Sequence, residues 1–115
     1  MKKIFFTLMV MGSVAIAHAD DELKRMESLC EQLGESAGVT MESHQIGLPL
    51  AKILPLSARL HTKPLEFFDK ESTLQAYSTP RYNTANYQKK AIADFRDKRH
   101  VDCLKLISKN VSAVD

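Results

Sequence analysis

The chain has 115 residues, of which 44% are hydrophobic and 26% charged, and its 16 Lys and Arg residues face 14 Asp and Glu residues. A chain of this length forms one domain rather than two. The basic pair at positions 2–3 supplies the whole excess of positive charge, so the rest lacks the basic surplus by which proteins bind nucleic acids.

The first 19 residues have the order of a cleavable signal peptide. A basic pair at 2–3 precedes the apolar run 4–11, and small residues stand at Ala17 and Ala19, as in an A-x-A cleavage site. The apolar run is shorter than the roughly 20 residues that a membrane-spanning helix needs. We predict a signal peptide over 1–19, cleaved after Ala19, and a single helical domain over 20–115. The expected location is the periplasm of a Gram-negative cell, with secretion to the medium as the alternative.

The chain contains two cysteines, Cys30 and Cys103. Neither stands at the predicted cleavage point, which excludes lipid attachment there. In an oxidising compartment an even cysteine count indicates pairing, and one intramolecular disulfide would enclose most of the chain and stabilise it by about 4 kcal/mol. A redox-active pair would have C-x-x-C spacing and a metal site would have clustered ligands, so the open alternative is intermolecular pairing.

The first element that we predict is an amphipathic helix over 20–46, with acidic residues at its positive N-terminal end. Gly34 and Gly38 are weak helix formers, so a break or bend can occur there. Turn residues at 47–49 end the helix. Its apolar stripe consists of Leu23, Met26, Cys30, Leu33, Ala37 and Met41.

The middle third has shorter elements. A helical turn at 50–54 ends at Pro55, and a second turn covers 56–60. A longer helix begins at 62–66, with proline near its first position, and ends at 78–80. The apolar residues that continue this helix are Leu65, Phe68, Leu74 and Tyr77.

The last helix is predicted from Thr84 to Lys109, capped by Asn83 or Thr84. We expect the residues that follow, 110–115, to fray. Its recurring face consists of Tyr87, Ala91, Phe95, Arg99, Cys103 and either Leu106 or Ile107.

These elements predict an all-α fold, a small three- to four-helix bundle whose long first and last helices are joined by one disulfide. Because Cys30 lies early in the first helix and Cys103 late in the last, the two helices should run antiparallel, with the middle segments packed across them.

The segments 76–82 and 88–95, followed by Cys103, resemble the small exported two-cysteine proteins common in gammaproteobacteria and their prophages. The first helix with Cys30 and the turn at 47–50 fit the same pattern. Members of this group are mostly uncharacterised, so the resemblance implies no catalytic residue.

No residue pattern indicates catalysis. His44, His61 and His100 are isolated from one another in sequence, which favours solvated surface histidines over metal ligands. No serine stands in a nucleophile motif. We therefore predict no enzyme activity, no catalytic residue, no cofactor and no metal site.

Two surface features are candidates for contact with a partner. The mixed-charge run 96–99 is typical of a solvated face. Tyr77, Tyr82 and Tyr87 are spaced by five residues across the turn at Pro80, and their rings can pack the turn or contact a partner protein.

The leading functional hypothesis is a non-enzymatic exported binding or interaction protein that acts on an unknown envelope protein. The alternative is a periplasmic stress chaperone with a disulfide-stapled helical fold, in which the histidines would be the pH trigger. A small enzyme ranks third.

Overall fold

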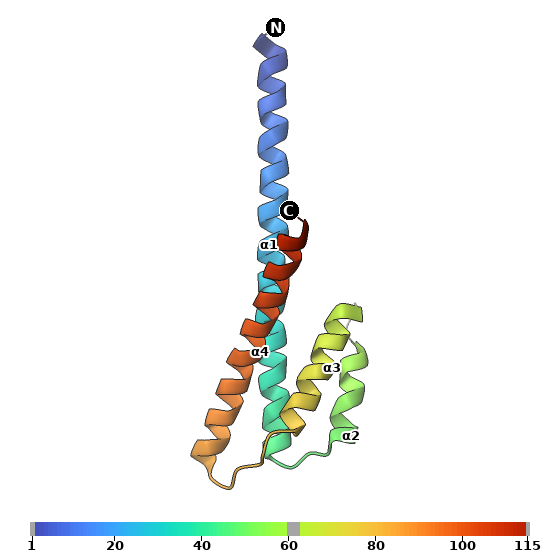
Figure 1. Cartoon of the computed structure of the whole chain (residues 1–115), viewed down its shortest axis with the longest axis vertical. Coiled ribbons are helices and arrows are strands. Elements are labelled where there is room, and N and C mark those ends of the chain that lie inside the picture. The colour runs from blue at the N-terminus through green and yellow to red at the C-terminus, as the bar shows by residue number, and fades with distance from the viewer. Residues whose placement is uncertain (1, 60–62, 115) are drawn as a thin grey trace.

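The computed structural model describes residues 2–59 and 63–114, with side chains described for 20–56 and 63–109. No strand occurs among these residues. The predicted all-α bundle is confirmed, with long first and last helices packed together (Figure 1). The described elements are α1 (Lys2–Gln45), α2 (Leu50–Ile53), the 3₁₀ helix η1 (Leu54–Arg59), α3 (Lys63–Tyr77) and α4 (Ala85–Val114).

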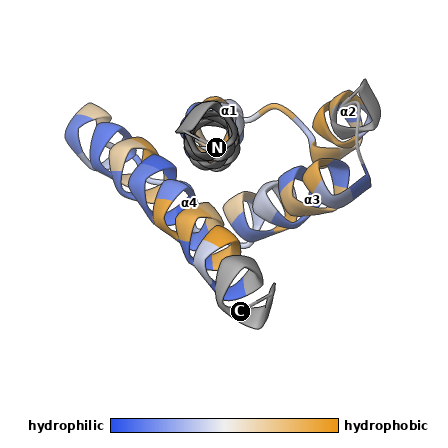
Figure 2. Ribbon diagram, turned by 90° about the horizontal axis from the view of Figure 1, so that it is seen from above, coloured by the Kyte–Doolittle hydropathy of each residue, from blue (hydrophilic) through white to orange (hydrophobic). Residues whose placement is uncertain are grey.

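Helices α1 and α4 run in opposite directions, and a disulfide joins them. The end of α4 returns alongside the middle of α1 (Figure 1). Cys30 and Cys103 are bonded, with their Cα atoms 5.4 Å apart, which confirms the predicted intramolecular pairing. Seen along the long axis, α4 lies on one side of α1 and the pair α2 and α3 on the other (Figure 2).

Helix α1 is longer than predicted. It begins at Lys2 rather than Asp20 and has 44 residues, which span about 66 Å at 1.5 Å per residue. Its first half extends beyond the other helices (Figure 1) and gives the molecule its long dimension of 74 Å. The predicted signal sequence is thus helical and continuous with the rest of α1, and its alanine, leucine and methionine residues favour helix. Its cleavage stays a prediction.

The break that the sequence allowed at the glycines of α1 does not occur. Helix α1 is continuous through Gly34 and Gly38, and both glycines face α4 at close range. A Cβ on Gly34 would lie 2.9 Å from the Cβ of His100, and one on Gly38 would lie 3.2 Å from the Cβ of Arg96. The glycines therefore set the spacing between the two long helices.

Among the described side chains, the core has two apolar clusters. The apolar stripe predicted for α1 is buried from Cys30 onward, whereas Leu23 is 40% exposed because it lies N-terminal to the disulfide that joins α1 to α4. The cluster around the disulfide contains Cys30, Leu33, Phe68 and Cys103. The second cluster contains Ala37, Met41, Ala76 and Phe95.

Helix α3 has the predicted bounds. On its predicted face Phe68 is buried and Leu65 and Tyr77 pack against the core, but Leu74 does not. Leu74 is 49% exposed, while Asp69, Ser72 and Thr73 are buried. The Ser72 hydroxyl donates to the Phe68 carbonyl oxygen at 3.0 Å, and the Thr73 hydroxyl donates to the Asp69 carbonyl oxygen at 3.0 Å. These bonds satisfy the hydroxyl groups and allow a polar face to be buried.

The remaining bounds differ slightly from the predictions. The 3₁₀ helix η1 includes Pro55, where a turn was predicted to end. The last residue of the second predicted turn, Leu60, lies outside the described residues. Helix α4 begins at Ala85 and continues to Val114, so the prediction that it ends at Lys109 is wrong.

Candidate functional site

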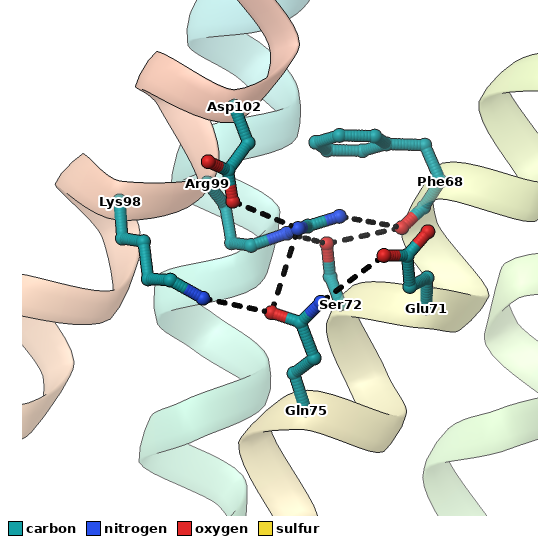
Figure 3. Close-up of polar contacts among 7 residues, drawn as sticks. All are labelled: Phe68, Glu71, Ser72, Gln75, Lys98, Arg99 and Asp102. Atoms are coloured by element: carbon teal, nitrogen blue, oxygen red, sulfur yellow. Dashed lines mark hydrogen bonds and ion pairs between the residues drawn. The ribbon is translucent and has the colours of Figure 1, made fainter.

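Arg99 is the most deeply buried charged side chain among the described residues, at 3% exposed. It lies between α3 and α4, as Figure 3 shows. Its Nε donates to the Ser72 hydroxyl at 2.7 Å, and its Nη1 donates to Oδ2 of Asp102 at 3.0 Å. The guanidinium carbon lies 4.0 Å from the centre of the Phe68 ring, a cation–π contact.

Gln75 extends this network toward the surface (Figure 3). Its side-chain oxygen accepts from Lys98 Nζ at 3.1 Å and from Arg99 Nη1 at 3.4 Å, and its amide nitrogen donates to Glu71 at 3.1 Å. The Arg99 guanidinium therefore has partners on both helices. This arrangement joins α3 to α4 and leaves no guanidinium edge directed at a ligand.

Arg99 corrects the interpretation of the mixed-charge run. Arg96, Asp97 and Lys98 are exposed as predicted, but Arg99 is buried. The helical period did indicate that Arg99 is buried, because Arg99 stands four residues from both Phe95 and Cys103 on the recurring face of the last helix.

Gln45 fixes the α3–α4 loop against the end of α1. Its side chain is 2% exposed. The amide nitrogen donates to the Pro80 carbonyl oxygen at 3.0 Å, and the amide oxygen accepts from the backbone N–H of Tyr82 at 2.9 Å. Gly47 follows with a φ of 93°, a conformation that glycine adopts without strain, and a Cβ there would lie 2.8 Å from the Arg81 guanidinium.

His44 corrects the prediction of solvated histidines. It is 9% exposed, its Nε2 lies 2.6 Å from the Thr79 carbonyl oxygen, and its ring centre lies 4.6 Å from that of Tyr77. Since a carbonyl oxygen can only accept, Nε2 carries the hydrogen. Protonation of Nδ1 would therefore preserve this bond. His100 is half-buried, and His61 lies outside the described residues.

The three tyrosines occupy two different environments. The Tyr77 hydroxyl donates to the Leu48 carbonyl oxygen at 2.8 Å, and burial raises the pKa of Tyr77 above its ordinary value because desolvation disfavours the phenolate. Tyr82 and Tyr87 are 38% and 63% exposed, and their ring centres are 6.2 Å apart. The structure thus brings Tyr82 and Tyr87 together and places Tyr77 in the packing of the loop.

Two apolar side chains that the sequence analysis missed lie at the same end of the molecule. Ile46 is 65% exposed and Leu48 is 40% exposed, on the turn that Gln45 and Gly47 hold against residues 80–82. The helical period gives no signal for them, because both lie beyond the end of α1 at Gln45. We call Ile46, Leu48, Tyr82 and Tyr87 the loop-end patch.

Within the described part of the chain, no group of three or more His, Cys, Asp or Glu side chains could hold a metal ion. In residues 2–59 and 63–114, no helix combines the length and apolar character needed to cross a membrane. No protein-family model, curated protein or solved structure matches the chain.

Proposed function

We propose that the chain is an exported, non-enzymatic protein that binds another envelope protein through the loop-end patch. One observation carries the proposal: Tyr82 and Tyr87 are exposed and adjacent, on a loop whose backbone is bonded to the buried Gln45.

Physical reasons favour such a patch as a binding surface. Tyrosine is enriched among residues that dominate interface energies, because its ring is large and its hydroxyl can still form hydrogen bonds. A loop already fixed by the hydrogen bonds of Gln45 and His44 loses little conformational entropy when a partner binds.

Export is supported by two further features. The signal-like order of the first 19 residues stands at the N-terminus, and the Cys30–Cys103 disulfide fits an oxidising location. The resemblance to small exported two-cysteine proteins supports the same location. The stress-chaperone alternative draws no support from His44, whose bond to Thr79 persists on protonation.

The test is affinity capture from envelope extracts with the protein expressed from its full-length sequence, followed by titration of the captured protein in purified form. Tyr82→Ala/Tyr87→Ala should weaken binding at least about tenfold, as expected for interface hot spots. Val39→Ala is the matched control, because Val39 is 63% exposed on α1 and outside the patch. Equal affinity of the double variant and the control would refute the proposal, and so would repeated failure to recover any partner.

A further inference from the structure

An apolar groove lies at the other end of the helical packing, beside the disulfide. It has a volume of about 400 Å³ and is formed by α1, α3 and α4, within the range of about 300–1,000 Å³ for small-molecule sites. Its floor is the disulfide cluster of Cys30, Leu33, Phe68 and Cys103. Residues 26–33 of α1 line it, well over ten residues from the loop-end patch, or about 20 Å along the helix.

The groove is open to solvent although its walls are apolar. Phe67 is 70% exposed and Leu106 is 50% exposed, whereas the neighbouring Phe68 is only 6% exposed. A phenylalanine ring in water forgoes a large part of the free energy that burial would provide. Apolar patches of this kind, when a polar rim surrounds them, mark binding sites.

A polar depression adjoins the groove and supplies positive charge. The two share Phe68, Glu71 and Leu106, and the depression, of about 560 Å³, is also lined by Lys105 and Lys109. Among the described side chains, no carboxylate lies within 4.0 Å of either lysine ammonium group.

Each carboxylate of the depression has a partner within the protein, although Glu71 keeps its negative charge because its partner is an amide. Asp102 accepts from Arg99 at 3.0 Å, and Glu71 accepts from the Gln75 amide at 3.1 Å. The two lysines are therefore the groups that can meet an incoming anion, and they stand next to an apolar cavity that can hold a hydrocarbon chain.

We propose that the groove binds a single-chain anionic amphiphile of the fatty-acid class. The acyl chain lies in the apolar groove over the disulfide, and the carboxylate lies in the depression near Lys105 and Lys109. The volume of the groove selects one chain over two. Because this site and the loop-end patch lie at different ends of the packed helices, the proposal does not depend on the protein-binding function.

The test is isothermal titration calorimetry with dodecanoate below its micelle concentration. The protein is expressed from its full-length sequence and purified without reductant. We expect one saturable site, tighter for dodecanoate than for dodecyl maltoside, which has the same chain and an uncharged head. Acetate, which has no chain, should show no binding.

Variants separate the chain site from the head site. Phe67→Ala should weaken dodecanoate binding by roughly tenfold, and Leu106→Ala should do the same if the first variant folds poorly. Lys105→Gln/Lys109→Gln should weaken dodecanoate by up to roughly tenfold and leave dodecyl maltoside unchanged, since two exposed ion pairs contribute modestly.

Matched controls are Val101→Ala and Lys89→Gln/Lys90→Gln, which change exposed side chains of α4 outside both cavities. They should bind dodecanoate like the unaltered protein. Absence of saturable dodecanoate binding would overturn the proposal. Equal affinities for dodecanoate and dodecyl maltoside would also overturn it. A dimer in sedimentation that Phe67→Ala dissociates would overturn it too, because a second copy of the chain would then cover the groove.

Discussion

Replacing Gly34 by alanine tests whether the glycines of α1 set the distance to α4. The added Cβ would lie 2.9 Å from His100 Cβ and 3.1 Å from the Arg96 carbonyl oxygen. The α4 backbone fixes the positions of both atoms, so the helices must shift apart. Overpacking of this kind costs about 1–3 kcal/mol, against a gain of about 1 kcal/mol in helix propensity. We expect Gly34→Ala to lower the free energy of unfolding by up to about 2 kcal/mol.

Gly38→Ala provides the matched comparison on the same helix face. Its Cβ would lie 3.2 Å from the Arg96 Cβ, a contact that a shift of a few tenths of an ångström relieves, and no backbone atom is among its nearest neighbours. The outer atoms of the Arg96 side chain, at 3.5 Å and beyond, can move because that side chain is 48% exposed. The propensity gain should then dominate, and Gly38→Ala should be neutral or more stable by up to about 1 kcal/mol.

The measurement is urea unfolding of both variants, followed by circular dichroism with the disulfide intact. An intact disulfide keeps the two helices tethered, so the comparison reports on their packing. Equal stabilisation by Gly34→Ala and Gly38→Ala would refute the reasoning. It would mean that α1 and α4 separate at no cost and that these glycines are only weak helix formers, as their sequence context suggests.

Three other outcomes follow from the contacts described above. Arg99→Lys should destabilise the fold by about 1–3 kcal/mol in urea unfolding, because an ammonium group cannot reproduce the guanidinium contacts to both helices. Arg99→Met should cost less, because it removes the buried charge. A larger loss of stability for Arg99→Met than for Arg99→Lys would contradict this account. The free energy of unfolding should be independent of Tyr77 at pH values below about 10, the pKa of a tyrosine in the unfolded chain. It should fall as pH rises from there through the raised pKa of Tyr77 in the folded chain, because the unfolded state loses the phenolic proton before the folded state does. Tyr77→Phe should abolish that alkaline loss, as followed by circular dichroism. The Cys30→Ser/Cys103→Ser variant should lose about 4 kcal/mol, and alkylation of the unreduced protein should add no mass, whereas two modified thiols would refute the bond.

The sequence predicted the parts of the fold that depend on helical period and turn residues. The burial of Cys30, Leu33 and Met41 follows from their spacing. The burial of His44 and Gln45 does not, because their partners are carbonyl groups more than 30 residues away. Tertiary hydrogen bonds of this kind leave no periodic signal in the chain.

The polar part of the buried face of α3 was missed for a related reason. Besides Phe68 and Ala76, its buried positions carry hydroxyl and carboxyl groups, and these fit the interior because each finds a local or long-range partner. Ser36 donates to Asp69 at 3.2 Å and Arg99 donates to Ser72 at 2.7 Å. Apolar counting along the sequence therefore selects Leu74, which the structure leaves 49% exposed.

The two long helices and α3 are thus held by different combinations of contacts. The disulfide and the close approach at Gly34 fix α1 to α4. Helix α3 joins them through Phe68 and Ala76, one in each apolar cluster, and through buried hydrogen bonds and the stacking of Arg99 on Phe68. Burial of Phe68 and Ala76 draws α3 onto the long helices, and the hydrogen bonds specify its orientation. In that orientation Phe67, the neighbour of Phe68, stays 70% exposed, so the groove beside the disulfide remains open.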